Sequence, residues 1–209
     1  MRKLRKSASG AALLALAALL GGCAGLFERA PPHLYRLAAE HSVPPAPAHT
    51  GARLLVLRPR AAAGLDTTRI ALTRPPVALD YFADSAWPRP LPRLLQSALV
   101  EAFNASGAVT AGGRGRLGLH PDFVLETKIG HFEAEYRSPS APPLARVALR
   151  LRLLRRKGER VLAAVRFSSE KKAAFNDVPH IVLALDEALD AVIEKSVRWT
   201  AQNPALQKR

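Results

Sequence analysis

The sequence predicts an α+β fold: a two-layer sandwich in which two principal helices pack on one face of a mainly antiparallel sheet. Apolar residues recur at helical spacing over residues 91–103 and again over residues 181–199, whereas they alternate with polar residues over residues 146–153. These segments follow the order strands, helix, strands, helix. That order is typical of helices that lie on one side of an antiparallel sheet.

Four short segments in the first half have the composition of strands: residues 33–37, 53–57, 67–73 and 77–82. The period then changes, and one apolar stripe indicates an amphipathic helix that ends at Ser106-Gly107. Its members are Leu91, Leu94, Leu95, Ala98, Leu99, Ala102 and Phe103.

The second half contains longer strand candidates. Residues 122–136 are sufficient for one bent strand or for two. Residues 146–153 alternate apolar side chains with mainly arginine ones, and Val161, Ala163, Val165 and Phe167 repeat the apolar spacing. A hairpin turn is predicted between the two segments at residues 156–159. One face of each alternating strand must therefore be directed at the core and the other at water or a partner.

The last helix is predicted to begin near Asn176-Asp177, because these residues cap helices well and Pro179 suits the first turn. Its apolar stripe consists of Ile181, Leu185, Leu189, Val192, Ser196 and Trp199.

The N-terminus has the features of a secretory signal. A basic patch at residues 2–6 precedes ten apolar residues, 11–20, and two glycines then lead to Cys23, the only cysteine. Ten apolar residues are about half of the roughly 20 that a membrane-spanning helix requires. Residues 20–23, Leu-Gly-Gly-Cys, resemble the lipobox of bacterial lipoproteins, which implies cleavage before Cys23 and acylation of that residue. The alternative is an ordinary signal peptide or uncleaved anchor with an incidental cysteine.

We therefore expect a lipoprotein signal peptide at residues 1–22, a lipidated N-terminus and short tether at 23–32, and one α+β domain at 33–201. This domain includes a Pro-rich, semi-rigid loop at residues 40–52, and a tail follows at residues 202–209. Ala24 follows the cysteine, which resembles lipoproteins sorted to the outer membrane; those kept at the inner membrane often have Asp there.

The chain is strongly basic. It has 31 Lys and Arg against 17 Asp and Glu, and removal of the signal with its four basic residues leaves 27 against 17, a net charge of +10. An export signal argues against nucleic acid as the partner. The remaining candidates are an anionic lipid or lipopolysaccharide surface and an acidic protein, or else a solvated surface that reflects a GC-rich coding bias.

No catalytic or metal-binding pattern is convincing. Residues 113–118 match G-x-G-x-x-G, but no helix is predicted after them, as a dinucleotide site requires. The six histidines lack metal-ligand spacing, and His131 is predicted to be a surface or hydrogen-bonded residue rather than a ligand. No nucleophile, base and oxyanion donor can be assembled. We expect a protein that is not an enzyme and that has no cofactor and no metal.

The segment 146–152 offers the clearest binding candidate. Arg146, Arg150 and Arg152 lie on one side of an alternating strand, where their guanidinium groups could bind carboxylates or lipid phosphates. The alternative is a solvated sheet face, or an edge that charge protects from pairing.

Together these features resemble the ABC-type transport auxiliary lipoproteins, the PqiC-like family. The similar positions are, in order, Cys23, Tyr35-Arg36-Leu37, Leu65-Asp66, Arg69-Ile70, Leu79, Tyr81, Trp87, Ser106-Gly107, Asp122-Phe123-Val124-Leu125, Phe132, Val161-Leu162-Ala163, Phe167 and Trp199. They extend over nearly the whole chain after the signal.

The resemblance implies a noncatalytic lipoprotein on the periplasmic face of the outer membrane, held there by lipidated Cys23. It would dock the periplasmic MCE-domain subunit of an ABC lipid transporter. A phospholipid contact and a homo-oligomeric ring are compatible with this role. The alternative functions are a structural protein for envelope assembly or cell-wall tethering and, third, an envelope hydrolase for which no catalytic pair can be named.

Overall fold

The computed structural model describes residues 31–37, 43–45, 50–74, 78–113, 121–138, 141–157 and 160–207. Residues Pro32–Arg209 form one compact unit, and every residue of the described hydrophobic core lies within it. The predicted signal peptide and Cys23 lie outside the described residues, as do most of the Pro-rich loop and of the G-x-G-x-x-G segment.

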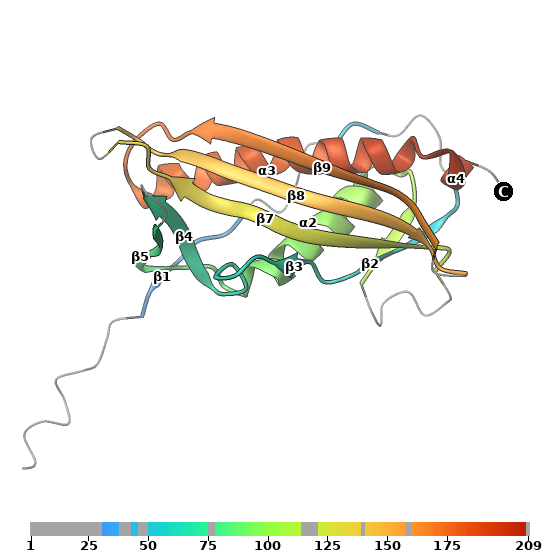
Figure 1. Ribbon diagram of the computed structural model, residues 1–209, viewed down its shortest axis with the longest axis horizontal. Helices are drawn as coiled ribbons and strands as arrows, with labels where there is room; N and C mark the ends of the chain where they lie inside the picture. Colours follow the sequence, from blue (N-terminus) through green and yellow to red (C-terminus); the bar gives the residue numbers. More distant parts are fainter. Residues whose placement is uncertain are drawn as a thin grey trace, which may run out of the picture. The chain divides into compact units, whose positions relative to one another are not determined.

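The described elements follow one another in the order shown in Figure 1. They are β1 (His33–Leu34), β2 (Arg53–Val56), β3 (Arg60–Ala61), β4 (Arg69–Arg74), β5 (Ala78–Ala86), α2 (Leu91–Ala105), β6 (Thr110–Gly112), β7 (Phe123–Glu135), β8 (Leu144–Arg155), β9 (Arg160–Lys172), α3 (Val178–Ala201) and α4 (Pro204–Gln207). The α+β class and both principal helices are as predicted. The short elements β3, β6 and α4 were not predicted.

All nine strands of the described residues belong to one sheet, and β7 organises it. Along one edge of β7 lie three short strands in series, β2, β3 and β4, all parallel to it. Along the other edge runs β8, which is antiparallel to β7 and to β9.

The sheet is therefore mixed, which corrects the expectation of a mainly antiparallel sheet. That expectation holds for the long ladders β7–β8 and β8–β9 and for β4–β5, but β1–β5 and β2–β6 are also parallel. The physical reason is that β2, β3 and β4 follow one another along β7 in one direction. The chain then crosses back through β5, α2 and β6 and enters β7 in that same direction, as parallel neighbours require.

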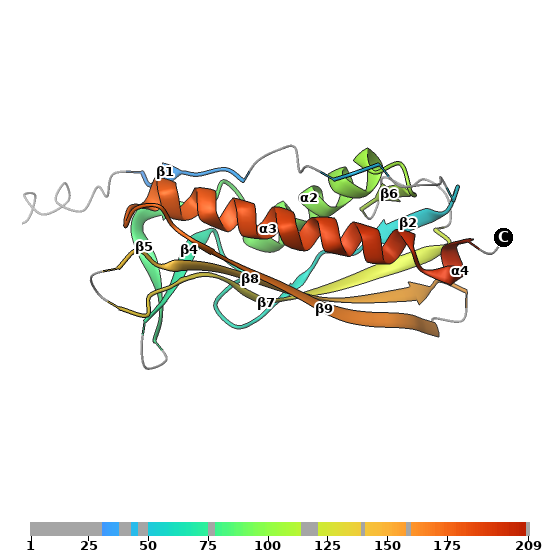
Figure 2. The ribbon, with the colours of Figure 1, turned by 90° about the horizontal axis from the view of Figure 1, so that it is seen from above.

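Both long helices lie on the same face of the sheet (Figure 2). Helix α3 packs against β8 and β9, and α2 packs against β6 and β2 and also contacts α3. The alternation of β8 follows from this arrangement: Val147, Leu149 and Leu151 are fully buried, whereas Arg150 and Arg152 are exposed on the other side. We call this second side of β3, β7, β8 and β9 the open face.

Two helix ends, the beginning of α3 and the end of α2, are formed as their sequences predict. The Asp177 side chain caps α3 by accepting a hydrogen bond from the His180 N–H at 2.9 Å, and Pro179 occupies the first turn. Helix α2 ends at Ala105 with Ser106 as its C-cap, and Gly107 follows with φ +69°, a left-handed conformation that favours glycine.

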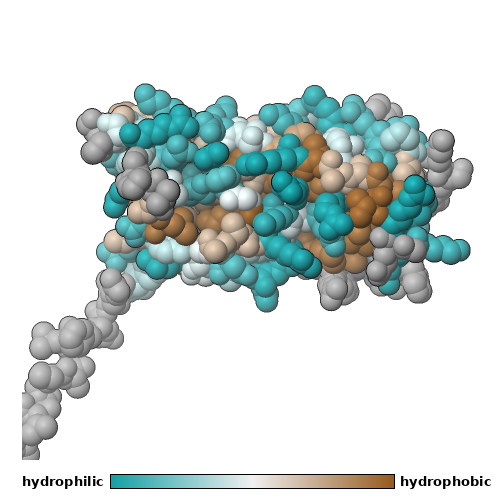
Figure 3. All heavy atoms as spheres, viewed as in Figure 1, coloured by the Kyte–Doolittle hydropathy of each residue, from teal (hydrophilic) through white to brown (hydrophobic). Residues whose placement is uncertain are grey.

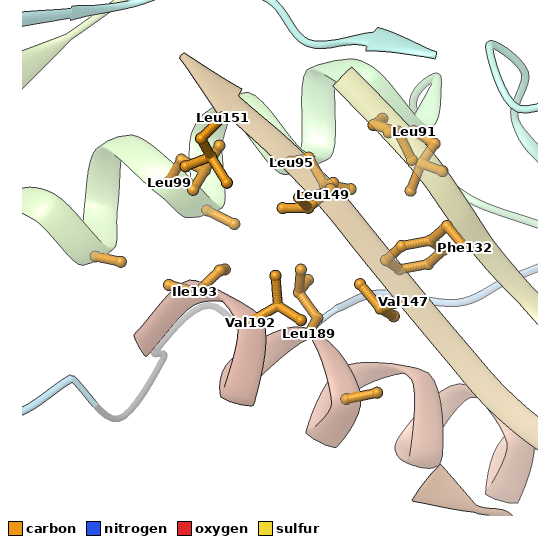
Figure 4. Close-up of a cluster of buried hydrophobic side chains, with 14 of the residues drawn as sticks. Leu91, Leu95, Leu99, Phe132, Val147, Leu149, Leu151, Leu189, Val192 and Ile193 are labelled. Atoms are coloured by element: carbon orange, nitrogen blue, oxygen red, sulfur yellow. The ribbon is translucent and has the colours of Figure 1, made fainter. Parts of the chain in front are cut away.

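Leucine, valine and isoleucine side chains from α2, α3 and β8 converge on Phe132 of β7 to form the core (Figure 4). The ring of Phe132 meets that of Trp87 edge to face, with centroids 6.0 Å apart. Two hydroxyls of α3, those of Ser196 and Thr200, are buried as well, and each donates to the carbonyl oxygen four residues earlier. Both of these buried hydroxyls therefore have a hydrogen-bond partner.

Removal of the Phe132 ring should destabilise the domain strongly. Phe132→Ala is expected to lower the free energy of unfolding by about 3–5 kcal/mol, because it leaves a cavity beneath the sheet. Phe175→Ala is the matched control: Phe175 is 61% exposed, and its replacement should cost less than about 1 kcal/mol. Urea unfolding of both variants measures the difference, and equal losses would contradict this description of the core.

Candidate functional site

The three predicted arginines lie on the open face, which Figure 3 shows from the front as mainly hydrophilic with apolar patches between. Arg146, Arg150 and Arg152 alternate along β8 with the buried Val147, Leu149 and Leu151. The structure therefore places them on one side of the strand, as the alternation predicts. Their role in binding stays a proposal.

Two of these arginines are already paired with carboxylates of the neighbouring strands. Arg152 Nη1 lies 3.0 Å from Glu126 Oε2. Arg146 contacts two carboxylates, with Nη1 at 3.2 Å from Glu135 Oε2 and Nε at 3.5 Å from Glu170 Oε1. Neither guanidinium group is a free ligand for a partner without first giving up a local ion pair.

Arg137 completes a four-residue cluster with Arg146, Glu135 and Glu170. Its Nε donates to Glu135 Oε1 at 2.8 Å, and its Nη2 lies 3.3 Å from Glu170 Oε2. The hydrogen bond from Arg137, with the positive charges of Arg137 and Arg146, holds the pKa of the Glu135 carboxyl below its ordinary value, and partial burial opposes this shift. This end of the open face is locally neutralised.

His131 and Glu133 form a second, partly buried pair. His131 Nδ1 lies 2.6 Å from Glu133 Oε1, and the Phe132 N–H donates to Glu133 Oε2 at 2.6 Å. Glu133 is only 5% exposed, so its carboxylate is used by its own strand. His131 is thus a hydrogen-bonded residue, as expected, and among the described residues no group of three or more His, Cys, Asp and Glu side chains could hold a metal ion.

Arg150 differs from the other two arginines because of the register of the sheet. Its partner on β7 is Lys128, and its partner on β9 is Arg166. Lys128 is in turn the partner of Arg60 on β3. All four side chains are exposed, and none forms an ion pair with another residue that the structure describes.

We call Arg60, Lys128, Arg150 and Arg166 the cationic row. Sequence reasoning singled out only Arg150 of these four. The signal that could have found the others is the strand register, which brings residues far apart in the sequence opposite one another. On one side of the row the open face has small side chains, since Ala148 is opposite Ser168. On the other side Arg152 forms an ion pair with Glu126.

A pH dependence of stability follows from the lowered pKa of Glu135. A carboxyl whose folded pKa lies below its unfolded value stabilises the fold above that unfolded value, here about 4.5, and the contribution is lost as the pH falls through the folded pKa. Glu135→Gln should therefore reduce the unfolding free energy by up to about 1 kcal/mol at pH 7, and the difference should vanish toward pH 3.

Urea midpoints of both proteins across this range provide the measurement. Glu101→Gln is the control, since Glu101 is exposed and pairs with no cation in the described part of the chain. A Glu135→Gln effect that is unchanged at pH 3 would contradict the assignment.

Comparison with solved structures supports the fold. The chain is similar to protein XCC0632 from Xanthomonas campestris, with 27% identity and a TM-score of 0.75 over 83% of this chain and 97% of that one. It is also similar to an uncharacterised protein, with 14% identity and a TM-score of 0.64 over 81% and 99% of the two chains. The hypothetical protein CT253 from Chlamydia trachomatis has 9% identity and a TM-score of 0.53 over 73% and 97%. The last two show the fold alone.

Among proteins of curated function, none matches the chain. In the part of the chain that the structure describes, none of the helices is long and apolar enough to span a membrane. The model of one protein family, described as the ABC-type transport auxiliary lipoprotein component, matches residues 35–195, which is well over half of the chain. The chain therefore belongs to this family of auxiliary lipoproteins of the cell envelope, which act with an ABC transport system.

Proposed function

We propose that this chain is a lipid-anchored, noncatalytic subunit that docks the periplasmic MCE-domain component of an ABC lipid transporter at the outer membrane. The observation that carries the proposal is the family match over residues 35–195, which includes almost all of the described core. The open face of the sheet, with Arg146, Arg150 and Arg152, is the proposed partner-facing surface.

The proposed anchor is Cys23. Each buried methylene of an acyl chain contributes about 0.8 kcal/mol to membrane binding, so that two or three chains on one residue hold a protein on the membrane essentially permanently. About ten residues separate Cys23 from β1, and a fully extended tether of that length reaches about 33–36 Å. A domain held this close to its membrane is suited to receive a partner that arrives from the periplasm.

A docking role accounts for the chemistry of the open face better than catalysis does. Glu126, Glu133 and Glu135 are each bound to a neighbouring side chain or backbone group. None of them is arranged as an acid or base beside a nucleophile. A surface of ion pairs and cations instead supplies electrostatic complementarity, which favours encounter and orientation between proteins.

Replacement of the proposed lipidation site should release the protein from the membrane. Cys23→Ala removes the thiol that would carry the diacylglyceryl group, so we expect no incorporation of labelled palmitate and loss of the protein from the washed envelope fraction. Ala24→Ser keeps the thiol and is the matched control. Acyl labelling of Cys23→Ala equal to that of the control would contradict lipidation at this residue.

Affinity capture tests the partner. The full-length chain, tagged at its C-terminus and extracted from the envelope in mild detergent, should recover an MCE-domain subunit together with its permease and ATPase, identified by mass spectrometry. An untagged chain is the control for nonspecific recovery. Recovery of only a barrel protein or cell-wall fragments would overturn the transporter role in favour of envelope assembly or cell-wall tethering.

A further inference from the structure

We propose that the cationic row Arg60, Lys128, Arg150 and Arg166 is a binding site for a line of carboxylates on a partner protein, spaced as on one face of an acidic helix. The inference deepens the proposed docking function, because it assigns the contact to one row of the open face. The row itself is a property of the sheet register, whatever the partner is.

The row is continuous across four strands. Lys128 is the register partner of both Arg60 on β3 and Arg150 on β8, and Arg150 is the register partner of Arg166 on β9. Register partners lie on the same face of a sheet, and neighbouring strands are about 4.8 Å apart. Four positive charges therefore follow one another over about 14 Å.

This arrangement is unfavourable for the isolated domain. Like charges directly opposite each other on neighbouring strands are destabilising. The rest of the open face avoids such contacts: Arg152 is paired with Glu126, and Arg146 with Glu135 and Glu170. Elsewhere on the open face no two cations are register partners among the described residues, so in the cationic row an external anion would supply the missing compensation.

The neighbouring residues favour a narrow anionic ligand over a flat one. On one side of the row lies Glu126, and on the other side, beyond Ala148 and Ser168, lie Glu135 and Glu170. A planar anionic membrane pressed against the open face would bring its phosphates close to these carboxylates. A single line of anions meets the cations without approaching the flanking acids.

The spacing favours a helix as the carrier of these anions. Residues three and four apart on a helix have Cβ atoms about 5–6 Å apart, close to the separation of neighbouring strands. Glutamates at successive i, i+4 and i+7 positions would thus face successive cations of the row. In an extended strand, side chains on the same side are about 6.6–6.8 Å apart, which fits the row less well.

The test uses residues 24–209, which contain the complete described core, and a fluorescent Ala-rich helical peptide of about 21 residues with glutamates along one face. The row variant is Lys128→Gln, Arg150→Gln and Arg166→Gln. The control variant, Arg36→Gln, Arg93→Gln and Lys195→Gln, removes the same charge from exposed cations of the N-terminal segment, α2 and α3. Fluorescence anisotropy at low salt measures binding of the peptide.

We expect the row variant to bind the peptide about tenfold more weakly than the control variant, because three exposed ion pairs are lost from one site. A peptide of the same composition with its glutamates scattered around the helix should also bind more weakly. Salt should weaken the binding of the natural chain more than that of the row variant.

Thermal unfolding gives a readout that does not depend on the peptide. The row variant should melt at a higher temperature than the natural chain at low salt, since it removes like-charge contacts, and the difference should shrink as salt is added. A lower melting temperature would mean that the row is structural and would overturn the proposal.

Two binding outcomes would also overturn it. The first is equal binding of the peptide by the row and control variants. The second is binding to vesicles of phosphatidylglycerol and phosphatidylcholine that depends on the row while the acidic peptide does not bind, which would make the membrane the occupant. Failure of the affinity capture while peptide binding depends on the row would reject the transporter partner and leave the site itself in place.

Discussion

The one-sided burial of the sheet determines most of what this domain presents to a partner. Helices α2 and α3 cover one face, so the large buried side chains of β7 and β8 must be directed toward it. A slip of one residue in β8 would place Arg150 in the core and Leu149 on the surface, at a cost that no local interaction could offset. The hydrophobic core therefore fixes the register, and the register in turn aligns the charges of the open face.

The charges that result are of two kinds. Arg137, Arg146, Glu135 and Glu170 form a closed cluster of ion pairs, whose net contribution to stability is small because the groups are partly exposed. The cationic row is different, since its residues are neighbouring like charges and form no ion pair with another described residue. Proteins retain locally unfavourable arrangements where binding requires them. On this face the ion-paired cluster is a surface whose charges are compensated, whereas the cationic row has the character of a binding site.

The sequence reveals the long, periodic elements and not the way they pair. Apolar spacing predicts α2 and α3, and alternation predicts β8, because each pattern reflects burial on one side of one element. The register between β8 and β9 is harder to predict from the sequence. A turn at residues 156–159 implies that Arg150 is opposite Val165, but a register shift beside Leu154 makes Arg166 the partner of Arg150. A second shift near Gly130 separates the two halves of β7. Bulges of this kind leave no strong sequence signal.

The parallel contacts of β2, β3 and β4 depend on a crossover whose return point no local pattern specifies.

A lipid anchor and a weakly binding face complement each other. If Cys23 carries acyl chains, attachment to the membrane does not depend on the open face, whose cations remain available for another partner. Confinement of the domain within about 33–36 Å of the membrane also raises its effective concentration for any partner that reaches that membrane. Under these conditions a row of exposed charges with modest affinity is sufficient, and it allows rapid release. Strong, fully buried contacts would instead hold the partner in place and slow its release.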